Sequence, residues 1–159
     1  MKKLATTCFS LMLVLQLSTS VALADRADDC QVLVSRAVSF VQDQGPEYAL
    51  KVFSAMKGPF IDRELYIFAC SLDNVMLGHP YRRDLIGQNV SEFKDVKGSA
   101  LFQEFKRVAE ERGEGWVDYW WGKPAEKGDF PKASFIKRVP GSNLYVGAGY
   151  YKTAGNTGQ

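Results

Sequence analysis

Residues 64–80 read ELYIFACSLDNVMLGHP, and the periodicity of the chain changes here. The first nine residues are rich in aromatic and β-branched side chains, which favour β-strands. Asp73 and Asn74 both tolerate a positive φ, so they can form a two-residue hairpin turn. The chain then returns through a short apolar segment that ends at Pro80, because proline cannot donate a backbone hydrogen bond. The stretch therefore predicts an antiparallel β-hairpin.

The segments before this hairpin predict two helices. Between residues 26 and 42, apolar residues recur at the spacing of one helix face. Gly45 and Pro46 break this pattern, and Pro46 suits the first position of a second, shorter helix. Gly58 and Pro59 end that helix. We therefore expect a long N-terminal helix followed by a short one.

The segments after the hairpin predict a long loop, a third helix and three strands. Residues 81–98 are polar with scattered glycines, and long loops in compact domains often carry function. Ser99 can cap a helix that Gly113 ends. Short connections imply antiparallel pairing, so we expect an α+β fold with one five-stranded antiparallel sheet and helices on its faces. The three predicted strands cover residues 115–121, 133–139 and 144–151.

The two ends of the chain are expected to lie outside the domain. The sequence starts with Met-Lys-Lys, continues with an apolar run, and reaches Ala22-Leu23-Ala24. This pattern is typical of a secretory signal peptide over residues 1–24, and an uncleaved membrane anchor is the alternative. We therefore predict a periplasmic or secreted protein with no membrane span after cleavage. The domain is expected to cover residues 25–152, with a disordered tail over 153–159.

Composition and motifs argue against several classes of function. The chain has 20 Lys and Arg against 18 Asp and Glu. Two of the lysines lie in the signal peptide, so the remaining charges balance. A nucleic-acid-binding protein would carry a basic patch, which is not expected here. The sequence has no nucleophile elbow, phosphate-binding loop, zinc-protease motif or dinucleotide motif. We therefore expect no catalytic activity, no cofactor, no metal site and no nucleic-acid partner.

Cys30 and Cys70 are the two cysteines outside the signal peptide. In an exported protein an even pair suggests a disulfide. Two buried free thiols are equally ordinary, so both interpretations stay open. A bond between them would mean that the first helix covers the sheet face that carries Cys70.

Four segments of the chain carry a resemblance to a known family. They follow one another at matching spacing and are the strongest pieces of a resemblance that covers about residues 26–152. Together they are similar to the single Cache domain, type 2, of bacterial extracellular sensors. Asn74 departs from this family at the hairpin turn, where glycine is usual, and Trp120 stands where a polar residue is common. The segments are ELYIFACSLDNVMLGHP (64–80), DLIGQNVSEFKDVKG (84–98), GEGWVDYWW (113–121) and KASFIKRVPGSNLYVGAGYY (132–151).

The resemblance implies both a fold and a function. The fold is a PAS-like sheet with a long N-terminal helix along one face and a small-ligand pocket on the other side. Such domains commonly sense small carboxylates outside the membrane, on a chemoreceptor or a kinase. We therefore expect an exported binding protein for a small organic anion, with output through a membrane receptor or kinase partner. The alternatives are a structural or adaptor domain with a vestigial pocket and a carbohydrate-binding module.

The resemblance also suggests pocket residues on the strand over 115–121. Side chains alternate along a strand, so Val117, Tyr119 and Trp121 share one face. The family pattern favours Tyr119 and Trp121 as pocket wall, whereas Trp116 and Trp120 point the other way. A plain core strand is the simpler interpretation. An aromatic sugar platform would need exposed, flat-lying rings.

The remaining candidates supply polar groups. Lys132 matches a lysine of the family, and its cation suits a carboxylate. Ser134 follows it on the same face, and Tyr66 can add a hydroxyl donor. His79 is the only histidine of the chain. A two-residue turn places it opposite Phe68, whereas a bulge or an odd-length turn would move it to the other face, so its side of the sheet stays open.

Overall fold

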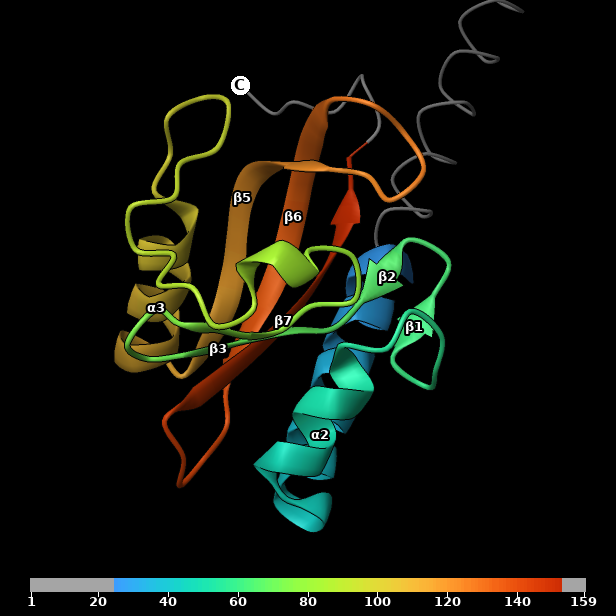
Figure 1. Ribbon diagram of the computed structural model, residues 1–159, viewed down its shortest axis with the longest axis vertical. Coiled ribbons are helices and arrows are strands. Elements are labelled where there is room, and N and C mark those ends of the chain that lie inside the picture. The colour runs from blue at the N-terminus through green and yellow to red at the C-terminus, as the bar shows by residue number, and fades with distance from the viewer. Residues whose placement is uncertain (1–24, 153–159) are drawn as a thin grey trace, which may run out of the picture.

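The structure is a computed structural model that describes residues 25–152 (Figure 1). The predicted signal peptide over 1–24 and the predicted tail over 153–159 lie outside the described residues. Within residues 25–152 no helix has both the length and the apolar character needed to cross a membrane.

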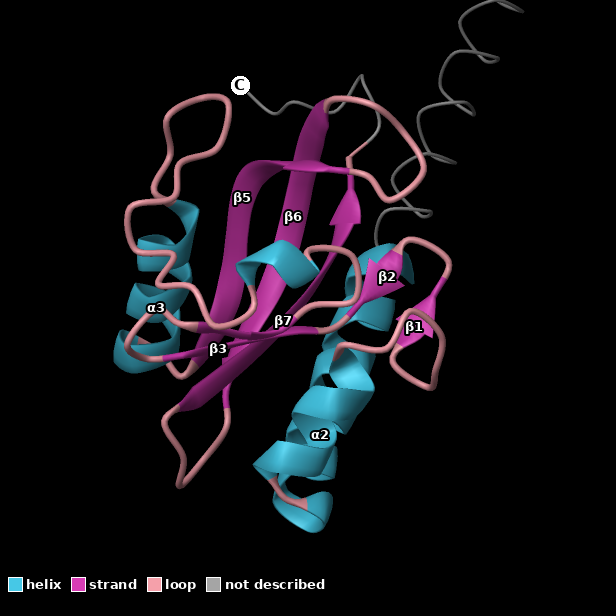
Figure 2. Ribbon diagram, viewed as in Figure 1, coloured by secondary structure: helices cyan, strands magenta, loops and turns pink. Residues whose placement is uncertain are grey.

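The chain order is two helices, a small hairpin, a larger hairpin, a loop, a third helix and three long strands (Figure 2). The described part of the N-terminal helix covers residues 25–44. The other helices are α2 (Pro46–Phe53), the 3₁₀ helix η1 (Arg83–Leu85) and α3 (Leu101–Glu111). The strands are β1 (Ile61–Asp62), β2 (Leu65–Tyr66), β3 (Phe68–Ser71), β4 (Met76–Gly78), β5 (Glu114–Gly122), β6 (Asp129–Arg138) and β7 (Leu144–Tyr151).

The main sheet has five strands in the order β4-β3-β7-β6-β5, and every neighbouring pair is antiparallel. The short strands β1 and β2 form a separate ribbon. Figure 1 shows α3 on one side of the main sheet and the N-terminal helix with α2 on the other. The predicted α+β fold, with one five-stranded antiparallel sheet and a long N-terminal helix, is confirmed.

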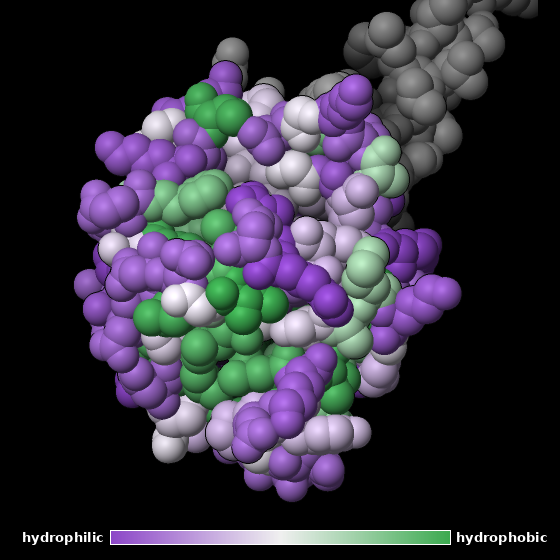
Figure 3. All heavy atoms as spheres, in the orientation of Figure 1, coloured by the Kyte–Doolittle hydropathy of each residue, from purple (hydrophilic) through white to green (hydrophobic). Residues whose placement is uncertain are grey.

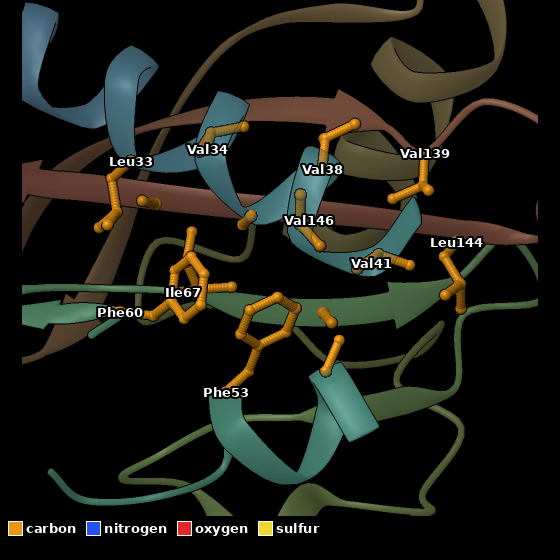
Figure 4. Close-up of a cluster of buried hydrophobic side chains, with 14 of the residues drawn as sticks. Leu33, Val34, Val38, Val41, Phe53, Phe60, Ile67, Val139, Leu144 and Val146 are labelled. Carbon is orange, nitrogen blue, oxygen red and sulfur yellow. The ribbon is translucent and has the colours of Figure 1, made fainter. Parts of the chain in front are cut away.

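Two apolar clusters fill the two sides of the sheet. The helix-side cluster joins the N-terminal helix and α2 to one sheet face, and Figure 4 shows its side chains meeting between these elements. The α3-side cluster joins α3 to the opposite face and is richer in aromatic rings. Its fully or nearly buried members include Phe68, Cys70, Met76, Phe102, Phe105, Val117, Tyr119, Trp121, Ile136, Tyr145 and Tyr151. Apolar atoms also reach the surface in the middle of the face drawn in Figure 3, where hydrophilic residues surround them.

The turn of the β3–β4 hairpin is longer than predicted. The backbone amide of Ser71 donates to the carbonyl of Val75 at 2.9 Å, so three residues connect the strands rather than two. Asn74, the last of the three, has a φ of 58°. A three-residue turn with its last residue in the left-handed region is a common hairpin connection, and asparagine tolerates that conformation.

A bulge then compensates for the extra turn residue. The register of the β3–β4 ladder shifts between Ala69 and Cys70, which leaves Leu77 as an extra residue on β4. As a result His79 still stacks near Phe68, with ring centroids 6.4 Å apart. His79 therefore lies on the α3 side of the sheet.

The two cysteines lie on opposite sides of the sheet. Cys30 belongs to the helix-side cluster, and Cys70 belongs to the α3-side cluster, where its Sγ lies 3.7 Å from Sδ of Met76. Both are free, buried thiols, and burial raises the pKa of each to about 12. The disulfide considered from the sequence is therefore not formed, because the sheet lies between Cys30 and Cys70.

The start of α3 also differs from the prediction. Ala100, and not Ser99, is the residue before the first helical turn, and no side chain caps this end. The backbone amide of Ser99 instead donates to Oδ1 of Asp95 at 2.9 Å. Ser99 thus belongs to the turn that Asp95 closes and does not cap α3.

Candidate ligand-binding site

Val117, Tyr119 and Trp121 of β5 share one face as predicted, but Trp120, predicted to point away from the pocket, lines a cavity together with Trp121. Val117, Tyr119 and Trp121 are buried in the α3-side cluster. Trp116 points the other way, packs on Phe135 and stays 36% exposed. The buried ring of Trp121 therefore cannot be part of an open, flat platform of the kind that carbohydrate-binding modules use.

Lys132 lies at the centre of the α3-side face. It is 1% exposed, and β6 pairs it with Tyr119 on one side and with Tyr151 on the other. Its Nζ donates a hydrogen bond to the hydroxyl of Tyr66 at 2.9 Å. The same nitrogen lies 4.0 Å from the ring centroid of Tyr66 and 4.8 Å from that of Tyr151. Two π-faces therefore partly replace the water that burial removes from the cation.

No carboxylate pairs with Lys132 among residues 25–152, although eleven other ion pairs occur there. Burial lowers the pKa of Lys132 to about 7, since the charged form loses its hydration. A buried charge without a counter-charge is costly and uncommon outside functional sites. Lys132 is thus a buried amine whose charged form has no counter-charge among the described residues.

A second polar pair lies next to Lys132. The hydroxyls of Tyr119 and Ser134 are 2.9 Å apart, and both residues are buried. Burial raises the pKa of Tyr119, so this hydroxyl stays protonated and can donate. Gly149 lies opposite Ser134 on β7 and leaves room for this pair.

His79, the residue after β4, adjoins the same region. Its ring centroid is 5.0 Å from that of Tyr66 and 5.9 Å from that of Trp121. Its Nδ1 accepts hydrogen bonds from the backbone amides of Tyr81 at 3.1 Å and Arg82 at 3.0 Å. Burial, together with the nearby cations of Lys132 and Arg82, lowers the pKa of His79 to about 3. The imidazole is therefore neutral at physiological pH.

Two cavities adjoin these side chains and share the rings of Tyr66 and Trp121. The first, called the inner chamber, has a volume of about 10 Å³, which is room for roughly one water molecule. The second, called the outer chamber, has a volume of about 200 Å³. The inner chamber is lined by Tyr66, Phe68, Met76, His79, Leu101, Phe102, Phe105, Tyr119 and Trp121. The outer chamber is lined by Tyr66, Tyr81, Arg82, Phe93, Lys94, Asp95, Val96, Trp120, Trp121, Gly122 and Asp129.

A family model described as a Cache domain matches residues 42–154, which is more than half of the chain. The chain belongs to the Cache domain family. The family predicted from the four sequence segments is thereby confirmed.

Proteins of bacterial chemotaxis are among the relatives of this Cache domain. The methyl-accepting chemotaxis protein McpP of Pseudomonas putida is 28% identical over 110 residues, which are 69% of this chain and 20% of McpP. The chain thus spans about a fifth of the length of that curated relative. A solved periplasmic sensor domain of a chemotaxis protein is 32% identical with a TM-score of 0.63, and the match covers 88% of this chain and 97% of that one. This Cache domain is therefore a sensor-type domain.

Two further solved structures share the fold at lower identity. A methyl-accepting chemotaxis protein from Vibrio parahaemolyticus has a TM-score of 0.72 at 18% identity, over 86% of this chain and 95% of that one. A Cache chemosensory domain described for its recognition of carboxylic acid has a TM-score of 0.62 at 23% identity, over 89% and 96%.

The Cache domain brings all six residues chosen from the sequence to one side of the sheet. Tyr66, His79, Tyr119 and Trp121 line the inner chamber. Lys132 and Ser134 line neither chamber; they hydrogen-bond to Tyr66 and Tyr119, which line the inner one.

Arg82 was not predicted from the sequence. Its guanidinium pairs with Asp84 at 2.7 Å and lies over the rings of Trp121 at 5.5 Å and Phe93 at 5.9 Å. It therefore stands at the mouth of the outer chamber. Its position directly after the His79–Pro80 end of the hairpin, at the start of the long loop, was the available signal.

Asp95 holds the wall of the outer chamber against the sheet. Its Oδ1 accepts from the amides of Lys97 and Ser99 at 2.9 Å each, and its Oδ2 accepts from the amide of Trp120 at 3.0 Å. Burial opposes ionisation of Asp95, but these backbone hydrogen bonds outweigh it and lower the pKa of the carboxyl. One side chain thus attaches the segment over residues 92–98 to β5, next to Trp121.

Proposed function

We propose that this Cache domain binds a small organic anion, and that a short carboxylate suits it best. The observation that carries the proposal is Lys132, a buried ammonium without a carboxylate partner among the described residues. An anion that entered the site would supply the missing counter-charge, and a charge-assisted hydrogen bond in a water-poor site is strong.

The surroundings of Lys132 favour a ligand with a short carbon skeleton. Aromatic rings line the inner chamber, and its volume of about 10 Å³ must expand even for a two-carbon acid. The hydroxyl of Tyr66 already accepts a hydrogen bond from Lys132. Its own O–H can therefore donate a hydrogen bond to a ligand oxygen. Arg82 adds a second cation at the mouth.

Output is proposed to pass through a partner outside residues 25–152. Chemotaxis proteins such as McpP are much longer than this chain, which covers 20% of McpP. A membrane receptor or a kinase is the expected partner, in the periplasm or outside the cell. A solved Cache neighbour recognises carboxylic acid, which agrees with the ligand class proposed here.

The alternative function is that of an adaptor domain with a vestigial pocket. It is favoured by one observation, because the inner chamber is almost filled by its own aromatic side chains. The two functions differ in what the protein does when a carboxylate is added. A binding domain must open the chamber and gain stability, whereas a vestigial one is unaffected.

Calorimetry with acetate, propionate, succinate and ethylamine tests the proposal. The wild-type protein is expected to bind at least one carboxylate and not the amine. Lys132→Met should weaken this binding more than tenfold, since removal of one partner of a buried charge pair costs about 2 to 5 kcal/mol. Lys137→Met is the matched control, because Lys137 lies on the same strand and pairs with Glu114 at the surface.

The control should bind within about twofold of wild type, an effect under roughly 0.5 kcal/mol. Binding of the amine, or equal binding by Lys132→Met and wild type, would show that Lys132 does not recognise an anion. Absence of binding for all four compounds would favour the adaptor function.

A further inference from the structure

His79 has two ring nitrogens with different surroundings. Nδ1 accepts two backbone N–H groups, from Tyr81 and Arg82. A nitrogen that accepts hydrogen bonds carries no proton, so the neutral ring must carry its proton on Nε2. The loop that begins at Pro80 thus fixes the tautomer of the ring.

The other ring nitrogen, Nε2, belongs to a residue that lines the inner chamber. No side chain or backbone group of residues 25–152 accepts a hydrogen bond from it. The fully enclosed polar atoms without a partner in this part of the chain are Oδ1 of Asn74 and the hydroxyl of Tyr145. Nε2 of His79 is not among these atoms, and His79 lines the inner chamber.

We infer that His79 is a positioning residue with two tasks. Through Nδ1 it fixes the backbone of Tyr81 and Arg82, which places the Arg82 guanidinium at the mouth of the outer chamber. Through Nε2–H it offers a ligand oxygen a neutral donor inside the inner chamber. The second task rests on the proposed function, whereas the first does not.

Burial above all, and then the cations around the ring, keep His79 neutral by lowering its pKa. Lys132 approaches from β6, and Arg82 approaches from the loop; both cations oppose a proton on His79. Asp84 on η1 is the nearby acid, and it pairs with Arg82. Tyr66 from β2 contacts the ring but is uncharged, since burial raises its pKa. His79 is therefore a constant donor over the pH range in which Lys132 changes charge.

Two substitutions separate the two tasks. In His79→Asn the side-chain oxygen takes the place of Nδ1, because asparagine readily accepts from backbone amides two and three residues ahead. This variant keeps the loop in place and loses the donor. In His79→Gln the longer amide can place its nitrogen near Nε2 but cannot accept from the loop. This variant keeps the donor and loses the loop contact.

Nitrogen NMR of the ligand-free protein tests the first task directly, because the chain has one histidine. The spectrum is expected to show a proton on Nε2, an unprotonated Nδ1, and no titration of the ring between pH 5 and 8. Amide exchange at Tyr81 and Arg82 should be as slow in His79→Asn as in wild type and faster in His79→Gln. A proton on Nδ1, or titration near the ordinary value of about 6.5, would overturn the inference.

Acetate and propionate serve as probes for the second task. His79→Asn should bind them about three to ten times more weakly than wild type, as expected for one lost hydrogen bond of about 1 kcal/mol. Binding within twofold of wild type would overturn the donor role. If wild type binds neither acid, the proposed function fails and the donor role fails with it, while the nitrogen spectrum still decides the contact with the loop.

Discussion

Lys132 holds a positive charge where water cannot reach it, and two tyrosine rings are its main substitutes for solvent. Cation–π contacts at desolvated sites contribute about 2 kcal/mol, which is less than the cost of burying an ammonium. Because the tyrosine rings do not fully offset the cost of burial, the pKa of Lys132 is lowered to about 7. A protein that retains this arrangement loses stability unless an anion joins the cation.

The pH dependence of stability should report this cost. Lys132 has a pKa of about 7 when folded, against about 10.4 in the unfolded chain. Between these values the unfolded state binds a proton that the folded state lacks, so the unfolding free energy rises with pH, by at most about 1.4 kcal/mol per unit. Denaturant titrations between pH 7 and 8 should show this rise in wild type, because at higher pH the thiols of Cys30 and Cys70 ionise in the unfolded chain and oppose it.

Lys132→Met should lack that rise, and Lys137→Met should keep it. Equal slopes in wild type and Lys132→Met would show that the lysine is not desolvated. Carboxylate binding should have the opposite trend, because the anion needs the protonated lysine. Affinity is expected to fall as pH rises above about 7.

Gly149 allows β7 to approach the pair of hydroxyls that Tyr119 and Ser134 form. A Cβ at Gly149 would clash with Oγ of Ser134 and with the carbonyl oxygen of Ala133. Gly149→Ala is therefore expected to lower the unfolding free energy by about 1 to 3 kcal/mol, as overpacking does.

Gly122→Ala is the control for this substitution. Its added methyl group would lie 3.5 Å from Oδ1 of Asp129, an ordinary contact. Chemical denaturation should give a change within about 0.5 kcal/mol for this variant. A loss as large as that of Gly149→Ala would mean that any strand glycine is sensitive and that the close approach at Ser134 is irrelevant.

At the scale of elements, the attachment of the long loop depends on Asp95. Its Oδ2 accepts the hydrogen bond of the Trp120 amide, which links residues 92–98 to β5. Hydrogen bonds to a charged group contribute about 1.5 to 3 kcal/mol. Asp95→Ala is therefore expected to raise amide exchange over residues 92–99 and to speed the release of bound carboxylate.

Asp118→Ala is the matched control, since Asp118 is an exposed residue of β5 that pairs with Lys152. Hydrogen-exchange mass spectrometry should show no change over residues 92–99 in this variant. If Asp95→Ala also leaves that segment protected, other contacts hold the loop and the role of Asp95 is wrong.

The β3–β4 hairpin shows what the sequence could and could not predict at this scale. Aromatic and β-branched residues predicted both strands, and strand alternation predicted that Tyr119 and Trp121 face one way. The predicted length of the turn was wrong, because Asp73-Asn74 suits both a two-residue and a three-residue connection. The bulge at Leu77 has no sequence signal of its own, since packing on both sides of the sheet selects it.

At the scale of the molecule, the four resembling segments predicted the family and nearly the whole topology. The prediction failed where two distant segments had to be placed in three dimensions. Cys30 and Cys70 each suited a buried position, but only the structure shows that the sheet separates them. Arg82 was missed for the same reason, because the path of a loop decides which rings its guanidinium meets.

The separated thiols lead to a test of the intact protein. The melting temperature should be the same with and without a thiol reductant, because no disulfide links the two clusters. Loss of a disulfide that closes a loop of about 40 residues would cost roughly 3 to 4 kcal/mol. A fall of several degrees on reduction would show that Cys30 and Cys70 are bonded.

All three tryptophans of the chain lie on β5, and this has an optical consequence. The intrinsic fluorescence of the protein originates from a single strand. Trp121 emits from the wall shared by both chambers, beside His79 and under Arg82, whereas Trp116 emits from the opposite face near solvent. A ligand that opens the chamber would change the emission of Trp121 and of Trp120, which lines the outer chamber, and would leave that of Trp116 as an internal reference. The protein therefore has an intrinsic fluorescence probe at the site where binding is proposed.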